Sequence, residues 1–316
     1  MNYAYSILAE LLPATAIALA FTYPVAAQDE VEDPVVKSEK DVVSDPTRTG
    51  RSIVLVQNGM VATSNYLASQ AGLDVLRNGG NAMDAAIAAG ATLWVVEPMM
   101  TGMGGDAFVL YYEAATGEVY ALNGSGRAPA ALSLEHFENT GQDSIKTTSW
   151  EAVTVPGAVD AYLTAHERFG SLPLSELFAA AIHYAENGYP VAQIVGTMWF
   201  TQVGKLRQDE YSKKLWLVDE RAPETGSIFR IPELGESIRR VVEGGRAAFY
   251  EGPIAEEIVR HAQATGGFLT MEDFASQRSE WVDPISTDYR GYRVYQCPPN
   301  GQGIAVLIML NILNGY

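Results

Sequence analysis

Apolar residues recur at helical spacing soon after residue 63. One stripe consists of four such residues, Leu67, Ala71, Val75 and Leu76. Ser64 or Asn65 can cap a helix ahead of this stripe, and the run Asn78-Gly79-Gly80 can stop it near Arg77. This spacing predicts an amphipathic helix whose apolar face lies against a core.

A second helix is predicted directly after this stop. Asn81 can cap it, and Asp84 falls at the third helical position, where a carboxylate meets free N–H groups and the positive end of the helix dipole. The run that follows, AMDAAIAAGATLWVV, has small or apolar residues on nearly every side. We therefore expect a buried helix that packs closely against its neighbours.

Two hairpins are predicted by strand-like runs on either side of a turn signal. The first joins Ser52–Val56 to Met60–Thr63 through an Asn-Gly turn. The second joins Phe108–Tyr112 to Val119–Leu122 through a Thr-Gly turn. A further extended strand is predicted at Tyr289–Gln296, before a Pro-Pro-Asn-Gly break.

The remaining pattern is mostly helical. Helices are predicted at Ala158–Arg168, Leu174–Glu186, Glu236–Glu243, Pro253–Ala264, Met271–Phe274 (capped by Thr270) and Ile304–Leu313. Hairpin strands with packed helices before and after them predict the α+β class rather than a doubly wound sheet. The last helix is strongly apolar and no closing element follows it, so we expect the chain to be truncated near Tyr316.

The N-terminal residues carry targeting and linker signals. Residues 1–27 are predicted to be a signal peptide, because Leu11–Phe21 is mostly apolar and Val25-Ala26-Ala27 resembles a cleavage site. Its apolar part is too short to span a membrane comfortably, so we expect a periplasmic or secreted protein without a membrane span. Residues 28–50 hold seven acidic and three basic residues and no aromatic, which predicts a disordered linker.

Charge and composition exclude several functions. The 316 residues carry a net charge of −17 and no basic stripe, which argues against a nucleic-acid partner. Cys297 is the single cysteine, so an intrachain disulfide is excluded, and the four histidines lack metal-ligand spacing. The glycines of TGMGGD precede a strand rather than a helix, so no nucleotide site is predicted there. We expect neither a metal nor a cofactor.

The stretch LNGSGRAP is the strongest candidate binding loop. Gly124 and Gly126 flank Ser125, and they permit either a close backbone approach or a positive φ. Arg127 could hold a carboxylate with two hydrogen bonds. The alternative is a polar turn that follows a strand and ends at Pro129, with the arginine bonded to the loop itself or to an acid. The residues alone leave both interpretations open.

Several ordered blocks together resemble the gamma-glutamyltranspeptidase family. They include GMVATSNYLASQAGLDVLRNGGNAMDAA, VTVPGAVDAYLTAHERFGSLPL and GGFLTMEDFASQRSEWVDPISTDYRGYRVYQCPPNGQG, and the resemblance covers about residues 50–316. It implies the N-terminal-nucleophile hydrolase fold, an αββα four-layer sandwich that is incomplete in this chain. Residues 51–316 are then expected to be part of a large-subunit domain, truncated at its C-terminus.

The resemblance also implies a reaction and a partner. Family precursors cleave themselves before a threonine, whose hydroxyl then forms an acyl-enzyme with a γ-glutamyl amide such as glutathione. The threonine begins a small subunit, which is the implied partner. Thr147-Thr148 lies in the wrong block and lacks the following pattern. We therefore expect no catalytic nucleophile in this chain, and no activity from it alone.

The binding loop departs from the family pattern. The usual form is Asp-Gly-Arg-Glu-x-Ala-Pro, whose arginine holds the α-carboxylate of the glutamyl group. Here Asn123 takes the aspartate column, Ser125 the arginine column, and Arg127 lies two residues late. PPNGQG similarly replaces Pro-Ser-Ser-Gly-Gly. Both changes resemble a divergent branch with acylase-like members.

Three functions therefore stay open. The first is a γ-glutamyl hydrolase or transpeptidase precursor. The second is an amide acylase of the same fold that takes glutaryl or β-lactam side chains. The third is an inactive binding module made of the large-subunit half. Arg127, Ser125 and Asn123 are the predicted substrate-binding residues in the enzyme interpretations.

Overall fold

The computed structural model describes residues 54–316. Its contacts divide the chain after Leu55, and Val56–Tyr316 form the larger unit. The predicted signal peptide (residues 1–27) and acidic linker (28–50) lie outside the described residues, so they stay predictions, as does the domain boundary at residue 51. Among the described residues, none of the helices combines the length and the apolar character that crossing a membrane requires.

The first two predicted helices are confirmed together with their caps. Helix α2 spans Tyr66–Arg77, and the Asn65 side chain accepts a hydrogen bond from the N–H of the second helical residue. Helix α3 spans Ala82–Val96, and Asn81 and Asp84 form a reciprocal capping box at its start. Both caps satisfy N–H groups that a helix cannot satisfy internally.

Asp84 also ties the start of α3 to a distant loop. Its carboxylate accepts hydrogen bonds from the backbone N–H of Asn81 (2.9 Å) and of Ser171 (2.9 Å), and from the Ser171 hydroxyl. Burial raises the pKa of Asp84, but these hydrogen bonds outweigh burial and hold the pKa below its ordinary value. The predicted capping residue Asp84 therefore also holds the loop around Ser171, which joins α5 (Ala158–Phe169) to α6 (Leu174–Leu177).

Helix α3 lies at the centre of the core, as its small residues predict. Trp94 stacks on Tyr162 of a neighbouring helix with ring centroids 4.7 Å apart, and burial raises the pKa of Tyr162 to about 12. Gly90 makes room for that tyrosine, because a Cβ at this position would lie 2.2 Å from its hydroxyl oxygen. The close packing depends on small residues along this face.

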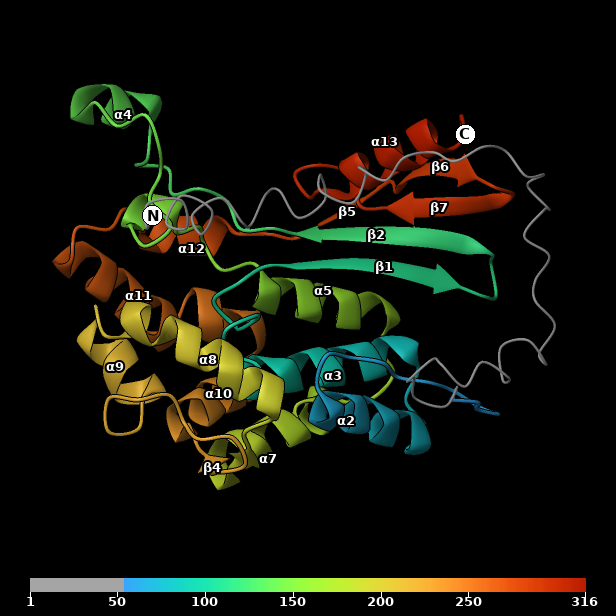
Figure 1. Ribbon diagram of the computed structural model, residues 1–316, viewed down its shortest axis with the longest axis horizontal. Helices are drawn as coiled ribbons and strands as arrows, with labels where there is room; N and C mark the ends of the chain where they lie inside the picture. The colour runs from blue at the N-terminus through green and yellow to red at the C-terminus, as the bar shows by residue number, and fades with distance from the viewer. Residues whose placement is uncertain (1–53) are drawn as a thin grey trace, which may run out of the picture. The chain divides into compact units, whose positions relative to one another are not determined.

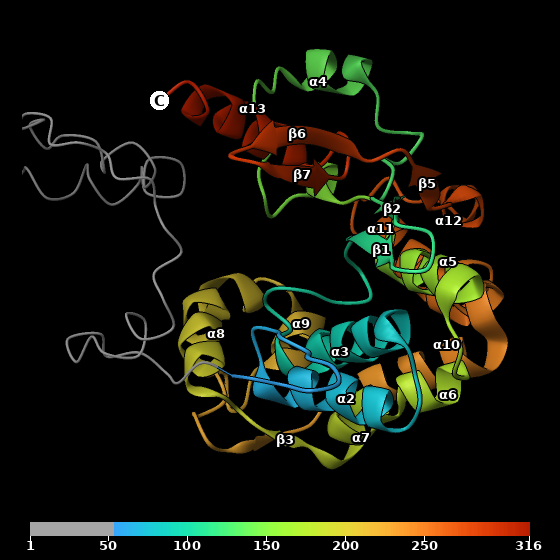
Figure 2. The same cartoon turned by 90° about the vertical axis from the view of Figure 1, so that its right-hand side faces the viewer.

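The central sheet has three strands in the order β1-β2-β5. The predicted second hairpin is confirmed as β1 (Ala107–Glu113) and β2 (Glu118–Gly124), antiparallel over their whole length. Strand β5 (Glu280–Val282), which the sequence analysis did not predict, pairs with the other edge of β2. Figures 1 and 2 show α5 (Ala158–Phe169) along one side of this hairpin and the C-terminal elements on the other.

Two predicted strand arrangements need correction. Residues 54–63 contain no helix or strand, and Val54, Leu55 and Val56 are exposed with no partner strand, so the first hairpin does not form in the described residues. The predicted strand Tyr289–Gln296 is confirmed over residues 292–296 as β7 (Tyr292–Gln296), but its first residue ends another strand, β6 (Ile285–Tyr289), and the two strands form a hairpin. Arg290 and Gly291 both have positive φ, which reverses the chain where an uninterrupted strand was expected.

The other predicted helices are confirmed with changes at their ends. The structure has α4 (Leu134–Thr140), η1 (Trp150–Ala152), α6 (Leu174–Leu177), α7 (Ala179–Asn187), α8 (Gln193–Leu206), α9 (Glu210–Trp216), α10 (Pro232–Tyr250), α11 (Pro253–Ala264), α12 (Met271–Ser276) and α13 (Gly303–Leu313), and a short strand pair β3 (Tyr189–Pro190) and β4 (Ile228–Phe229). The predicted helix Leu174–Glu186 is divided at Phe178, and α10 is longer than predicted and kinks at Gly245. Helices α4, α8 and α9 were not predicted. The α+β class is confirmed.

Helix α13 differs from the others in how little of it is buried. It contacts β6 and β7, and Leu307 is its one buried residue. Six of its large apolar residues are exposed: Ile304, Val306, Ile308, Met309, Ile312 and Leu313. The apolar pattern thus predicted the helix correctly, although most of its apolar surface faces solvent in this chain.

Candidate functional site

The stretch Asn123–Arg127, here called the 123–127 loop, begins at the end of β2. The Asn123 Oδ1 accepts a hydrogen bond from the Ser125 N–H (3.0 Å) and so closes the first turn of the loop. A Cβ on Gly124 would lie 2.4 Å from the Ala161 Cβ, and one on Gly126 would lie 1.9 Å from the Val155 carbonyl oxygen. The two glycines therefore serve close approach, the first of the two uses that the sequence allowed.

Gln277 holds the backbone of the 123–127 loop from the opposite side. This side chain is fully buried, and its Nε2 donates to the Ser125 carbonyl (3.2 Å) while its Oε1 accepts from the Arg127 N–H (3.3 Å). The Arg127 carbonyl accepts from the Val155 N–H (2.9 Å). The Gly126 N–H donates to the Asp106 Oδ1 (2.7 Å). Since both ends of the arginine's backbone are bonded, its Cα has a fixed position.

A buried ion pair fixes the segment that carries Gln277. Asp160 on α5 is almost completely buried, and its Oδ1 accepts from the Arg246 Nε at 2.8 Å. The other carboxylate oxygen accepts from the Ser279 N–H at 2.5 Å, and the Arg246 Nη2 also donates to the Gln277 carbonyl. These charge-assisted bonds hold residues 277–279 directly before β5.

Asn300 joins the polar side chains of the loop. Its Nδ2 donates to the Ser125 Oγ (2.7 Å), and its Oδ1 accepts from the Asn123 Nδ2 (3.3 Å). The sequence analysis noted the unusual PPNGQG segment that contains this residue but did not assign it to the site. Its departure from Pro-Ser-Ser-Gly-Gly was the signal that could have identified it, since the 123–127 loop departs from the family pattern as well.

The Arg127 side chain makes an ion pair at the surface. Its Nη2 lies 2.6 Å from the Glu280 Oε1, and the two side chains are 58% and 62% exposed. Neither side chain makes another hydrogen bond within residues 54–316, so most guanidinium donors and one carboxylate oxygen remain open to solvent. The arginine is bonded to an acid, as the structural interpretation expected. Whether it also binds a substrate anion stays a prediction.

The site is therefore suited to binding rather than to covalent chemistry. The three predicted residues Asn123, Ser125 and Arg127 lie in one loop, and Ser125 is bonded to an amide rather than to a base. No group of three acidic, histidine or cysteine side chains in the part of the chain that the structure describes could hold a metal ion. What the loop offers a ligand is an exposed pair of opposite charges beside a polar amide cluster.

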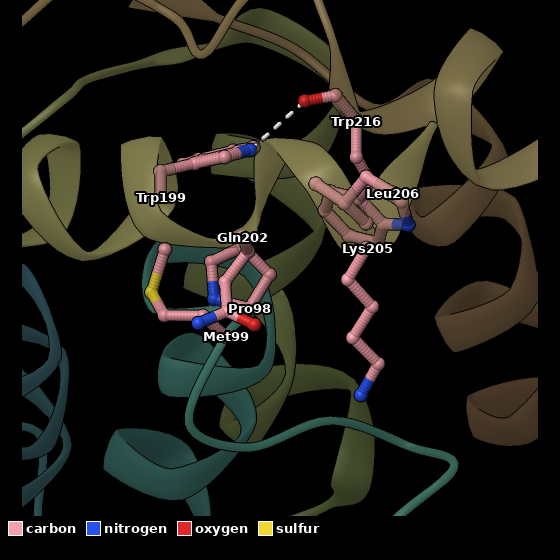
Figure 3. Close-up of a pocket in the computed structure, with 7 residues that line it drawn as sticks. All are labelled: Pro98, Met99, Trp199, Gln202, Lys205, Leu206 and Trp216. Carbon is pink, nitrogen blue, oxygen red and sulfur yellow. Dashed lines mark hydrogen bonds between the residues drawn. The ribbon is translucent and has the colours of Figure 1, made fainter. Parts of the chain in front are cut away.

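Cavities lie elsewhere among the described residues, and two of them are lined by tryptophan side chains. One, of about 230 Å³, is lined by residues from α8, α9 and the turn after α3: Pro98, Met99, Trp199, Gln202, Lys205, Leu206 and Trp216. Figure 3 shows the Trp199 indole N–H pointing to the Trp216 carbonyl (2.9 Å) and the Lys205 side chain extending away from it. The other, of about 380 Å³, lies beside β2 and β5, where Arg168 stacks over Tyr120 and Trp281. Neither is lined by residues of the 123–127 loop.

Comparison with known proteins gives a consistent result. A family model described as gamma-glutamyltranspeptidase matches residues 68–316. The chain is 42% identical over 258 residues to the glutathione hydrolase-like YwrD proenzyme of Bacillus subtilis, covering 81% of this chain and 49% of that protein. The chain spans about half the length of the curated relatives it matches.

Solved structures agree with the sequence comparison. Gamma-glutamyltranspeptidase of Helicobacter pylori aligns with a TM-score of 0.79 at 30% identity, over 84% of this chain and 77% of that one. Cephalosporin acylase from Bacillus halodurans aligns with a TM-score of 0.81 at 42% identity, over 87% of this chain and 52% of that one. The structural neighbours thus include a transpeptidase and an acylase, the two kinds of enzyme that the sequence analysis left open.

Proposed function

Because the chain belongs to the gamma-glutamyltranspeptidase family and has its N-terminal-nucleophile hydrolase fold, we propose that it is the large-subunit part of a γ-glutamyl hydrolase or transpeptidase precursor. The proposed substrates are glutathione and other γ-glutamyl amides. The predicted family and fold are confirmed; the activity, substrate and partner are the proposal. We further propose that the precursor is exported to the periplasm or secreted, and that its own small subunit is the partner after self-cleavage.

The observation that supports this proposal is the fixed position of Arg127. Its backbone N–H and carbonyl are bonded to Gln277 and Val155, while its guanidinium remains more than half exposed. A γ-glutamyl donor carries a carboxylate far from the amide that reacts. A pre-positioned guanidinium binds such a carboxylate with charge-assisted hydrogen bonds. The 123–127 loop is then the donor-binding loop.

The proposed chemistry is acyl transfer through a threonine ester. The threonine Oγ attacks the γ-carbonyl carbon while its free amine takes the hydroxyl proton, and the amide C–N bond breaks as that proton passes to the leaving amine. Water or an acceptor amine then attacks the ester and releases glutamate or a new γ-glutamyl amide. The relatives are named as proenzymes, and this chain covers about half of their length. In the proposal, the threonine lies in the part of the protein that corresponds to the other half. Residues 1–316 alone are then inactive.

An amide acylase is the second candidate. The cephalosporin acylase from Bacillus halodurans is 42% identical to this chain, against 30% for the Helicobacter pylori transpeptidase. Ser125 stands where the family arginine is expected, and Arg127 is already paired with Glu280. A site altered in this way could take glutaryl side chains, which keep the carboxylate of glutamate but lack its amine.

The test is an assay of the purified product of the complete reading frame. We expect release of p-nitroaniline from γ-glutamyl-p-nitroanilide, faster than from glutaryl-p-nitroanilide, and no release by a polypeptide of residues 1–316. Faster turnover of the glutaryl compound would favour the acylase. A reading frame that stops after codon 316, or a full product that hydrolyses neither compound, would overturn both enzyme proposals and favour an inactive binding module.

A further inference from the structure

The cavity of about 230 Å³ between α8, α9 and the turn after α3 is separate from the 123–127 loop. We call it the Trp199 pocket. Most of its lining is apolar, and Gln202 and Lys205 are the two side chains with strongly polar ends in the described lining. Figure 3 shows these two side chains beside the indole rings of Trp199 and Trp216. Because no residue of the 123–127 loop lines the pocket, its ligand is independent of the proposed function of that loop.

Both indole rings of the Trp199 pocket are held in place. Trp199 is almost completely buried, and its Nε1 donates a hydrogen bond to the carbonyl of Trp216 at the end of α9 (2.9 Å). Phe229 of β4 packs against both rings, at centroid distances of 4.8 Å from Trp199 and 6.4 Å from Trp216. The pocket therefore has rigid aromatic walls, which lose little side-chain freedom when a ligand enters.

The polar side chains of the Trp199 pocket have unused hydrogen-bond donors. Lys205, in the last turn of α8, is exposed, and within residues 54–316 its ammonium makes neither an ion pair nor a hydrogen bond. The Gln202 Nε2 donates to the Thr201 Oγ1 (3.1 Å), which leaves its second N–H available. The described lining contains no aspartate or glutamate, so no lining side chain repels an anion.

We infer that the Trp199 pocket binds a small aromatic carboxylate. The ring of such a ligand can pack against the indoles and the Met99 thioether, contacts that aromatic rings favour. Its carboxylate can accept charge-assisted hydrogen bonds from Lys205 and an amide hydrogen bond from Gln202. A pocket of about 230 Å³ is smaller than the roughly 300–1,000 Å³ of sites for drug-sized ligands, which favours one ring on a short chain over a peptide.

Three probes separate the contribution of the ring from that of the charge. 3-Phenylpropionate carries both, 3-phenylpropanamide keeps the ring without the charge, and propionate keeps the charge without the ring. In isothermal titration of the full reading-frame product, we expect 3-phenylpropionate to bind roughly tenfold more tightly than 3-phenylpropanamide, the effect of about one charge-assisted hydrogen bond. Propionate should bind more weakly than either, because it lacks the ring that packs on the indoles.

Two variants change the charge of the pocket in different ways. Lys205→Met removes the ammonium and keeps an unbranched side chain, so it should abolish the preference for the carboxylate and leave the affinity for 3-phenylpropanamide unchanged. Gln202→Glu keeps the shape of the side chain and adds a negative charge, so it should weaken 3-phenylpropionate and spare the amide.

Lys214→Met is the matched control for the loss of a surface charge. Lys214 is an exposed lysine of α9 that does not line the pocket and makes no ion pair within the described residues, so its loss should change none of the three affinities. An excess of L-glutamate should not displace 3-phenylpropionate, since the 123–127 loop does not line the pocket. A wild-type protein that binds no 3-phenylpropionate, or has no preference for it over the amide, would overturn the inference. Displacement by L-glutamate, or a Lys205→Met protein that keeps the preference, would overturn it as well.

Discussion

Two arginine–carboxylate pairs meet the chain beside Ser279, and they differ in burial and in the number of their hydrogen bonds. In the first, Asp160 is 3% exposed and Arg246 is 22% exposed. In the second, Glu280 and Arg127 are 62% and 58% exposed. Both pairs contact the short segment that leads into β5, so their surroundings differ by depth rather than by position in the chain.

The buried ion pair makes more hydrogen bonds than the exposed one. Both oxygens of Asp160 accept hydrogen bonds, from Arg246 and from the Ser279 N–H, and Arg246 additionally lies over the Tyr250 ring and contacts Glu251. Within the described residues, the side chains of Arg127 and Glu280 make a single hydrogen bond, the one that joins them. A buried charge must be fully compensated, whereas an exposed one keeps water as a partner. The buried pair is therefore committed to the fold, and the exposed pair is free to exchange water for a ligand.

Removing the buried carboxylate should have the largest effect. Asp160→Ala removes the buried carboxylate partner of Arg246, which then keeps only the half-exposed Glu251, and leaves the Ser279 N–H without an acceptor, so we expect a loss of about 3–5 kcal/mol in the free energy of unfolding. Urea denaturation followed by tryptophan fluorescence measures it. Glu280→Gln is the control, with a small change. Equal losses for the two variants would remove the distinction between the pairs.

Gln277 connects the two pairs, and its loss should rank second. Gln277→Leu keeps the volume but leaves the Ser125 carbonyl and the Arg127 N–H unsatisfied, which we expect to cost about 3 kcal/mol. Because the 123–127 loop loses its support, L-glutamate affinity should fall as well. Gln277→Glu retains one acceptor and should recover part of the stability. Full stability of the leucine variant would show that solvent satisfies these groups.

A methyl group on Gly126 should cost less than either. It would overlap the Val155 carbonyl, so Gly126→Ala should lower stability by about 2 kcal/mol and shift the loop. Gly104→Ala is the matched control, because nothing lies within 4 Å of a Cβ there and its φ is not positive. Thermal unfolding of the two variants, measured side by side, tests this. An unchanged midpoint for Gly126→Ala would mean that the loop moves without cost.

The sequence predicted features whose partners lie close together in the chain, and it missed those whose partners are distant. The capping box of Asn81 and Asp84 and the helix Pro253–Ala264 were predicted correctly because their signals lie within a few neighbouring residues. The family resemblance located the 123–127 loop, because Asn123 and Ser125 align with the aspartate and the arginine of the family pattern. The partners of that loop, Gln277, Glu280 and Asn300, lie 150 to 177 positions away, so no local pattern could reveal them.

Short elements failed for a related reason. Strand β5 has three residues and exists through its pairing with β2, so its own sequence carries little alternation. Conversely, Val54–Val56 has the pattern of a strand but finds no partner among the described residues. Local preference was decisive where an element satisfies its own hydrogen bonds, as helices do, and insufficient where a distant partner must supply them.

The smallest expected effect belongs to the exposed pair itself. In a double-mutant cycle with Arg127→Met and Glu280→Gln, the coupling in unfolding free energy should be at most about 1 kcal/mol, because exposed ion pairs gain little over water. Added salt should reduce it further. The same cycle measured on L-glutamate affinity should show a larger coupling, since Glu280 contacts the Arg127 guanidinium that is proposed to bind the carboxylate. A stability coupling well above about 1 kcal/mol would instead show that the pair holds the loop, and a group committed to the fold in that way would not be free to bind a substrate.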